Sequence, residues 1–202
     1  MHRALPLFLA CLLLAGCASA PQTAGQAGAT VGSPGNPVLV IAFTPNETVR
    51  VRFEDRLQAD LAAKDIIAVP GHDLVSSFAL LNRDQLLIAA EELNAPMILM
   101  VRRLITELPG DGSSPPTGIE RHRTLQEYML NVDRQRLPDL PPAGRQVIEV
   151  AGYLRNANAT ELVWSGYSWV DFHGDLDAAI AETSETIARN LAPACQGIRC
   201  DF

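Results

Sequence analysis

Four side chains between positions 171 and 177 are the best candidates for metal ligands in this chain. They are three aspartates and one histidine, Asp171, His173, Asp175 and Asp177. Carboxylate oxygens and an imidazole nitrogen can together bind a divalent cation. Their spacing matches no known cation-binding loop, and they stand where an expected strand leads into an expected helix. Aspartates in that position cap the helix and offset its dipole, so we expect caps and no metal site.

The other residues with catalytic potential form no known active-site motif. His72, His122 and His173 provide neither a His-x-x-x-His pair nor the HExxH pattern of zinc proteases. No serine lies in a GxSxG motif, and no glycine-rich loop is suited to a phosphate. The sequence therefore predicts a protein that is not an enzyme and holds no cofactor. A hydrolase that uses His173 with Asp171 or Asp175 is the remaining catalytic alternative.

Two groups of residues are candidates for contact with a partner. Arginines concentrate positive charge in an otherwise acidic chain at four positions, Arg121, Arg123, Arg134 and Arg136. Such a cluster can bind an acidic protein or an anionic glycan, although charges of this kind are more often simply solvated. Trp164 and Trp169 lie on an expected hairpin. There they either pack under a helix, which is the favoured interpretation, or form an exposed platform for a partner.

The first residues have the features of an export signal. His2 and Arg3 give a positive start, and the run from Leu5 to Ala15 is apolar apart from Pro6. A helix that crosses a bilayer needs about 20 residues, so this run is too short to be a membrane anchor. We therefore expect residues 1–16 to be a signal peptide that is removed on export.

The end of this segment resembles the lipobox of bacterial lipoproteins. The residues that carry the resemblance are Leu14, Ala15, Gly16 and Cys17. It implies cleavage before Cys17 and attachment of a lipid to its thiol, and several acyl chains together hold a protein firmly to a membrane. Ala18 stands where retention in the inner membrane would need aspartate, which implies the periplasmic face of the outer membrane. An ordinary signal peptide with a chance cysteine is the alternative.

Composition divides the exported chain into a tether and one domain. Residues 17–37 consist mostly of small and polar residues that cannot bury enough apolar surface to fold, so we expect a flexible tether. Residues 38–193 suit a single domain. The whole chain has 16 basic and 23 acidic residues and a net charge of −7. Without a basic stripe, the domain is not expected to bind nucleic acid or an anionic lipid surface.

Cys195 and Cys200 are the cysteines that remain in the folded part once Cys11 is removed and Cys17 is lipidated. In an oxidising compartment, such a pair is expected to form a disulfide, which here would close a tail at residues 194–202. A metal site is the alternative, but two thiols fall short of the usual four ligands.

The first half of the domain alternates strands with helices. Val38 to Phe43 and Met97 to Val101 are continuous apolar runs, typical of strands buried on both faces, and Ile66 to Val69 is a shorter run. Between these runs, apolar residues recur at helical spacing from Val49 to Leu61 and from Leu86 to Leu93, which predicts two amphipathic helices. This order of elements predicts parallel strands.

Polar residues at the starts of these helices predict their caps and their surface ion pairs. Asn46 or Thr48 is expected to cap the first helix, and Asn82 with Gln85 resembles a capping box at the second. Two pairs at i, i+4 spacing are expected as ion pairs on the first helix, namely Arg50 with Glu54 and Arg56 with Asp60.

The segment from Thr106 to Arg145 has no regular pattern and is rich in proline. A structureless loop of this length is uncommon in a compact domain, so we expect a partly disordered excursion at residues 106–145. Leu125 to Val132 inside it fits either a short helix or a short strand, and the strand is favoured.

The β pattern returns after the excursion. Val147 to Leu154 and Leu162 to Val170 are rich in β-forming residues, and the turn residues between them predict an antiparallel hairpin. A final helix is expected from Asp175 to Leu191, with Asp175 as its cap and Pro193 ending it. The expected fold class is α/β, with α+β as the alternative, in one mixed sheet of about five strands with three helices.

Several of these features resemble a broad family of small periplasmic lipoproteins of bacteria, many of unknown function. The resemblance spans residues 38–191 and rests on the first strand and on a set of residues that follow it, Arg50, Phe53, Glu54, Val69, Pro70, Glu161, Leu162, Val163, Trp164 and Ser165. Members have an α/β fold similar to LpoB, to the amino-terminal domain of TolB and to the periplasmic domain of CsgG. The resemblance implies an interaction or assembly module that binds other envelope proteins. A domain that senses a small ligand or a metal is the alternative.

Overall fold

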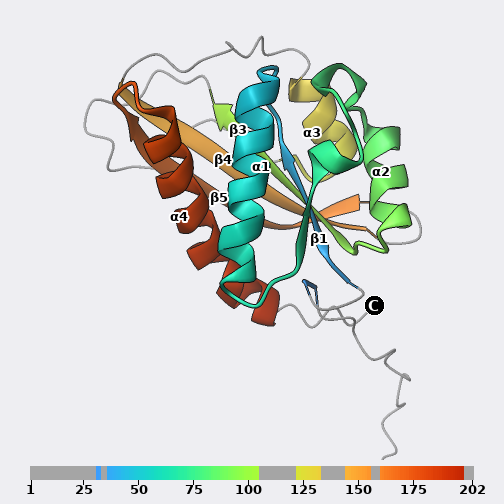
Figure 1. The fold of residues 1–202 in the computed structure, drawn as a ribbon. Coiled ribbons are helices and arrows are strands. Elements are labelled where there is room, and N and C mark those ends of the chain that lie inside the picture. The colour runs from blue at the N-terminus through green and yellow to red at the C-terminus, as the bar shows by residue number, and fades with distance from the viewer. Residues whose placement is uncertain (1–30, 33–35, 105–121, 133–143, 156–159, 198–202) are drawn as a thin grey trace, which may run out of the picture.

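The computed structural model describes residues 31–32, 36–104, 122–132, 144–155 and 160–197. Their five strands form one mixed sheet in the order β2-β1-β3-β4-β5, with helices packed on both of its faces (Figure 1). The α/β class and the mixed five-stranded sheet predicted from the sequence are confirmed. None of the helices in the described part of the chain is long and apolar enough to cross a membrane.

The first half of the chain forms the parallel part of the sheet. Its elements are β1 (Val38–Ala42), α1 (Glu47–Ala62), β2 (Ala68–Pro70), α2 (Arg83–Glu92) and β3 (Met97–Leu104), with the 3-10 turns η1 (Gly71–Asp73) and η2 (Phe78–Leu80) between β2 and α2. β1 is the middle strand of this parallel part and pairs with β2 on one side and β3 on the other. Every residue of β1 is buried, as its unbroken apolar run predicts.

Asparagine side chains begin both helices of this half. The Asn46 side chain accepts a hydrogen bond from the Val49 backbone N–H at 3.1 Å, so Asn46 is the cap of α1 and Thr48 is not. Asn82 accepts from the Gln85 backbone N–H at 3.0 Å in the same way. Each bond satisfies one of the backbone donors left without a partner at the start of a helix.

The second half supplies the antiparallel part of the sheet and the last helix. β4 (Gly144–Arg155) pairs antiparallel with β3 and with β5 (Thr160–Phe172), as the predicted hairpin requires. α4 (Leu176–Gly197) follows, and Asp175 caps it by accepting from the Ala178 backbone N–H at 3.0 Å. The prediction that Pro193 ends this helix is wrong, because α4 continues to Gly197. A proline removes one backbone donor, and here the last turn continues past that loss.

Leu125–Val132 forms a helix, α3, and not the short strand that the sequence analysis favoured. Leu125, Tyr128 and Met129 are buried while Leu130 is exposed, which is the spacing of a helix and not the alternation of a strand. Thr124 supports the first turn by accepting from the Glu127 backbone N–H at 3.2 Å. The fold therefore has a fourth helix inside the expected excursion at residues 106–145, and β4 also begins inside it, at Gly144. Residues 105–121 and 133–143 lie outside the described part of the chain.

Two hydrophobic cores lie on opposite faces of the sheet. One packs under α1 and α4, and the other packs under α2 and α3 (Figure 1). Val31 belongs to the first core, and the carbonyl of Gly32 accepts a hydrogen bond from the Ile67 backbone N–H at 2.6 Å. Contacts of the domain therefore reach back to residues 31 and 32 of the segment expected to be a tether.

Candidate functional site

The three aspartates among the candidate metal ligands at positions 171–177 make contacts within the fold. Asp171 pairs with Arg145 on the neighbouring strand at 3.2 Å, and Asp175 caps α4. Asp177 pairs with Arg52 of α1 at 3.1 Å, and the His173 side chain is exposed. Among the described residues, no group of three or more His, Cys, Asp or Glu side chains is placed to hold a metal ion. Asp175 is therefore a helix cap, as the sequence predicted, and Asp177 lies in the first turn of α4, whereas Asp171 belongs to β5 and forms a cross-strand ion pair.

The predicted partner residues are only partly placed. Arg123 is exposed next to α3, whereas Arg121, Arg134 and Arg136 lie outside the described residues. Trp164 is half-buried and packs against the core under α4, with its ring over Gly166, where an added Cβ would lie 3.4 Å from it.

Trp169 is half-buried on β5, opposite Val147 of β4.

Cys17 and Cys200 lie outside the described residues, and Cys195 falls in α4, where only its backbone is described. The lipid anchor and the disulfide therefore stay predictions.

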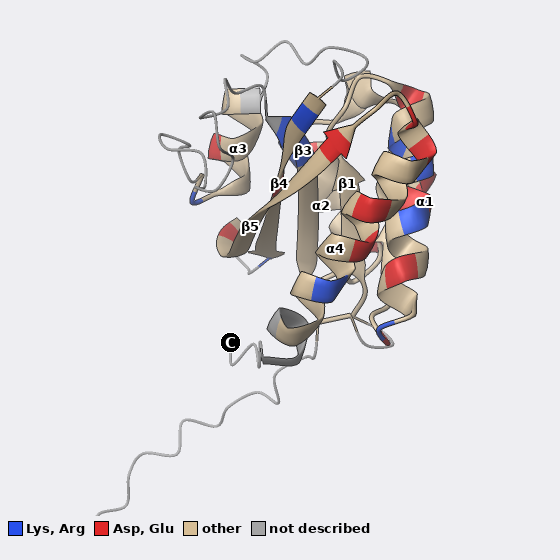
Figure 2. Ribbon diagram, turned by 90° about the vertical axis from the view of Figure 1, so that its left-hand side faces the viewer, with Lys and Arg blue, Asp and Glu red and all other residues tan. Residues whose placement is uncertain are grey.

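β2 and β5 are the edge strands of the sheet, and β5, with 13 residues against three, presents the longer edge. Beyond β5, pairing is confined to its beginning, where Thr124 forms an isolated bridge with Glu161 and the Leu162 backbone N–H donates to the Arg123 carbonyl at 2.9 Å. From Val163 onward, no described residue forms a backbone hydrogen bond with this edge. Charged residues of β5 occur only near the two ends of the strand. Its middle is therefore tan in Figure 2, where charged residues are blue or red.

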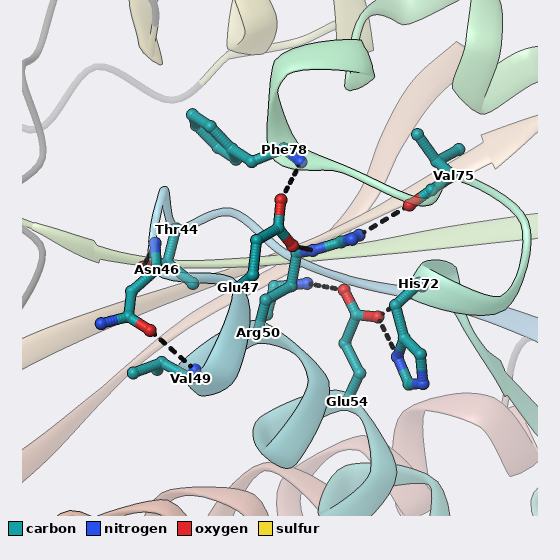
Figure 3. A network of polar contacts seen from close by, with 10 residues as sticks. Thr44, Asn46, Glu47, Val49, Arg50, Glu54, His72, Val75 and Phe78 are labelled. Atoms are coloured by element: carbon teal, nitrogen blue, oxygen red, sulfur yellow. Dashed lines mark hydrogen bonds and ion pairs between the residues drawn. The ribbon is translucent and has the colours of Figure 1, made fainter.

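A buried polar network joins the start of α1 to the turns that follow β2 (Figure 3). Glu54, which is fully buried, accepts hydrogen bonds from the backbone N–H groups of Ala42 at 2.9 Å and His72 at 2.7 Å. The ring Nδ1 of His72 lies 2.9 Å from the same carboxylate. Arg50, only 1% exposed, pairs with Glu47 at 2.6 Å and donates to the Val75 carbonyl at 3.0 Å.

This network corrects the predicted surface pair of Arg50 with Glu54. Both side chains point into the protein and each has other hydrogen-bond partners, whereas the second predicted pair, Arg56 with Asp60, is present at 2.9 Å. Burial raises the pKa of Glu54 above its ordinary value, and the hydrogen bonds from Ala42 and His72 offset only part of that rise. Its complete burial and its two backbone partners indicate that Glu54 fastens α1 to neighbouring segments and is inaccessible to a substrate.

A second buried polar cluster lies under α3, on the opposite face of the sheet. Arg102 of β3 and Glu149 of β4 are cross-strand neighbours, each 3% exposed, and they form an ion pair. The Arg102 guanidinium lies 4.7 Å from the centre of the Tyr128 ring, a cation–π arrangement. Tyr153 donates its hydroxyl to the His122 carbonyl at 3.2 Å. Burial raises the pKa of Tyr128 and of Tyr153, and for Tyr153 the charge of Glu149 adds to the rise.

A cavity of about 120 Å³ lies on the α1 and α4 face, at the end of the sheet where β1, β3 and β5 finish. Its wall is largely apolar and includes Phe43, Phe53, Ile148, Phe172 and Ile180. Such a cavity bears on the alternative function expected from the sequence, a domain that senses a small ligand. Trp164, Trp169 and His173 are not part of this wall, although Phe172 on the same hairpin is.

Sequence reasoning missed the buried Arg102–Glu149 pair and the cavity. A signal for the pair was present, because Glu149 interrupts an apolar strand run and Arg102 follows another directly. Opposite charges inside buried strands must find each other, since an unpaired buried charge is very costly. The cavity had no such signal, because its lining comes from residues of four strands and two helices that only the fold brings together.

Comparisons with known proteins give similarities of backbone arrangement only. No family model matches the chain, and no curated protein sequence matches it. Among solved structures, a dodecamer of a single-substitution variant of PelC from Paraburkholderia phytofirmans is 16% identical, with a TM-score of 0.38 over 82% of this chain and 93% of that one. A second PelC dodecamer from the same organism is 14% identical, with a TM-score of 0.37 over 84% of this chain and 92% of that one.

A protein of Caulobacter crescentus CB15 described as a candidate lipoprotein is 14% identical, with a TM-score of 0.33 over 79% of this chain and 90% of that chain. The expected similarity to LpoB, TolB and CsgG stays a prediction. Similarities at this level assign the chain to no family.

Proposed function

We propose that this protein is a lipid-anchored lipoprotein on the periplasmic face of the outer membrane, and that its α/β domain is a non-catalytic interaction module of the cell envelope. The lipobox ending at Cys17 supports the anchor. The observation that supports the module is the edge of β5, which from Val163 onward is unpaired among the described residues and can offer a strand for pairing with another polypeptide.

The two edges of the sheet differ in how well they resist pairing. Proteins protect edge strands by keeping them short, or by placing proline or charge on them. β2 follows this rule, because it has three residues and ends at Pro70. β5 does not, because it has 13 residues and its middle carries neither proline nor charge. An unprotected edge of this length is expected to serve as a binding site, since otherwise it would promote aggregation.

The partner that fits this edge is an extended segment of another envelope protein. Strand addition provides affinity through backbone hydrogen bonds, and side-chain pockets next to the strand provide specificity. Because the middle of β5 is uncharged, the added segment is expected to be largely uncharged as well. A second copy of this chain could present such a segment too, and the experiment below separates the two.

The test is photo-crosslinking in living cells at two positions of equal exposure. Val163 on β5 and Ile67 beside β2 are both 41% exposed, so they are matched sites for a photoreactive amino acid. We expect an adduct from position 163 and none from position 67. Adding Ser165→Lys, which places a charge on the same strand, should remove the adduct while the folded domain persists by circular dichroism.

The mass of the adduct identifies the occupant. Twice the mass of this chain would indicate a second copy, and another mass would indicate a different envelope protein. Equal adducts at positions 163 and 67, or an adduct at 163 that Ser165→Lys leaves unchanged in a folded protein, would show that β5 is not the docking edge.

A further inference from the structure

The cavity on the α1 and α4 face lies where open α/β sheets commonly bind ligands. β1 connects through α1 to β2 on one side, and the chain then crosses through α2 to β3 on the other side. The crevice outside the carboxyl ends of two strands whose connections run in opposite directions is the usual ligand position in such sheets. Ala42 and Phe43 at the end of β1, and Val101 and Arg103 of β3, line the cavity at this point.

The lining combines a broad apolar wall with one cationic group. Arg103 is half-buried and follows Val101 by two residues, so both side chains lie on the same face of the sheet. Burial lowers the pKa of Arg103, because part of its guanidinium is shielded from water. The remaining polar side chains of the wall are uncharged, apart from Arg102, whose side chain pairs with Glu149 on the opposite face.

We propose that this cavity binds a small amphiphilic carboxylate, with its apolar chain in the cavity and its carboxylate on Arg103. Ligand pockets typically have this composition, with an apolar lining and a few polar groups that fix orientation. A guanidinium has five N–H donors in a fork that matches a carboxylate, so it can hold the ligand in addition to contacts within the protein. This site is separate from the β5 edge and goes beyond the proposed interaction module.

The volume of the cavity limits how much of the ligand can be buried. An apolar cavity of about 150 Å³ lined by Leu, Ile and Phe is known to hold a benzene molecule. The present cavity, at about 120 Å³, is slightly smaller and opens to solvent. It therefore suits a short linear chain whose last carbons are buried while the carboxylate end stays at the mouth, and octanoate is a suitable probe.

The test is titration of the purified protein with octanoate and with n-octanol, which has the same chain length and no charge. We expect saturable binding of octanoate. The affinity for octanol should be lower by a factor of about ten or more, because a charge-assisted hydrogen bond to Arg103 is lost. Arg103→Met should reduce the affinity for octanoate by a similar factor and leave octanol unaffected. Arg145→Met is the matched control, since Arg145 is an arginine on the next strand that does not line the cavity.

A second variant keeps the proposal testable if Arg103→Met fails to fold. Ala179 of α4 lines the cavity and is only partly buried, so Ala179→Leu should fill the space and abolish binding of both ligands. The proposal is overturned if octanoate does not bind at about 10 mM. It is also overturned if octanol binds as tightly as octanoate, or if folded Ala179→Leu binds octanoate with unchanged affinity.

Discussion

Glu54 and His72 are joined by two hydrogen bonds to one carboxylate oxygen, from the backbone N–H of His72 at 2.7 Å and from its ring Nδ1 at 2.9 Å. The two residues are 18 positions apart, and the bonds fasten α1 to the turn after β2. Gly71 before His72 lies so close to β1 that an added Cβ would be 2.2 Å from Ile41 Cδ1. The turn is therefore held against β1 by packing and against α1 by hydrogen bonds.

The raised pKa of Glu54 predicts a specific dependence of stability on pH. Burial places the folded-state pKa above the ordinary value of 4.5, so the folded protein binds this proton more tightly than the unfolded chain does. The stabilisation from this shift is fully present below pH 4.5 and is lost as the pH rises through the folded-state pKa. Urea unfolding from pH 4 to pH 8 should show this loss, and Glu54→Gln should remove it.

The control for this measurement is Glu185→Gln, which removes an exposed carboxylate that pairs with Arg189 at 2.9 Å. We expect the pH profile of this variant to follow the wild-type profile, because an exposed helix pair contributes little to stability. If Glu54→Gln also follows the wild-type profile, Glu54 is not the source of the pH dependence.

Removing one partner of the buried Arg102–Glu149 pair should lower the free energy of unfolding far more than replacing both partners with apolar residues. Arg102→Met leaves a buried carboxylate without its partner, which typically costs about 3–5 kcal/mol of unfolding free energy. Combining it with Glu149→Leu removes both charges, and the double variant should recover most of that loss. Denaturation with urea measures the loss of unfolding free energy for Arg102→Met, for Glu149→Leu and for the double variant. A double variant as unstable as the single variants summed would show that the two charges are not coupled.

The two buried tyrosines under α3 should respond in opposite ways to loss of their hydroxyl groups. The Tyr128 hydroxyl is buried and has no hydrogen-bond partner among the described residues, so Tyr128→Phe should leave stability unchanged or raise it. Tyr153→Phe loses the bond to the His122 carbonyl and should lower stability by about 1 kcal/mol. The same urea measurement compares them. A large loss from Tyr128→Phe would reveal a partner for that hydroxyl, such as a buried water.

Sequence patterns predicted the elements whose periodicity is unambiguous. The unbroken apolar run at Val38 became β1, an inner strand of the sheet, and the asparagines at 46 and 82 became helix caps. α3 was missed because its eight residues are too few for the period of its apolar residues to separate a helix from a strand. Pro193 failed as a helix end because proline near the last turn costs one hydrogen bond and leaves the earlier turns intact.

Prediction of the site failed where burial decides the role of a charged residue. Spacing of four residues placed Arg50 and Glu54 on one helical face, which is correct, but it could not show that this face packs against η1 and β1. Spacing also grouped the aspartates around the start of α4, and only the structure shows that Asp171 and Asp177 pair with different arginines. Cross-strand register, which brings Arg102 beside Glu149, is likewise set by tertiary pairing.

Replacing the predicted lipidated cysteine tests the anchor on which the proposed location depends. Cys17→Ala removes the only thiol of the lipobox, so the protein should be found soluble in the periplasm or retained with its signal peptide, while the wild type stays in the outer-membrane fraction. Mass spectrometry of the mature first residue should find an acylated Cys17. Cys11→Ala is the control, because Cys11 lies within the expected signal peptide and should leave fractionation unchanged. Wild-type protein that is soluble and begins with an unmodified residue would remove the anchor, while the edge of β5 would still be available to partners of a secreted domain.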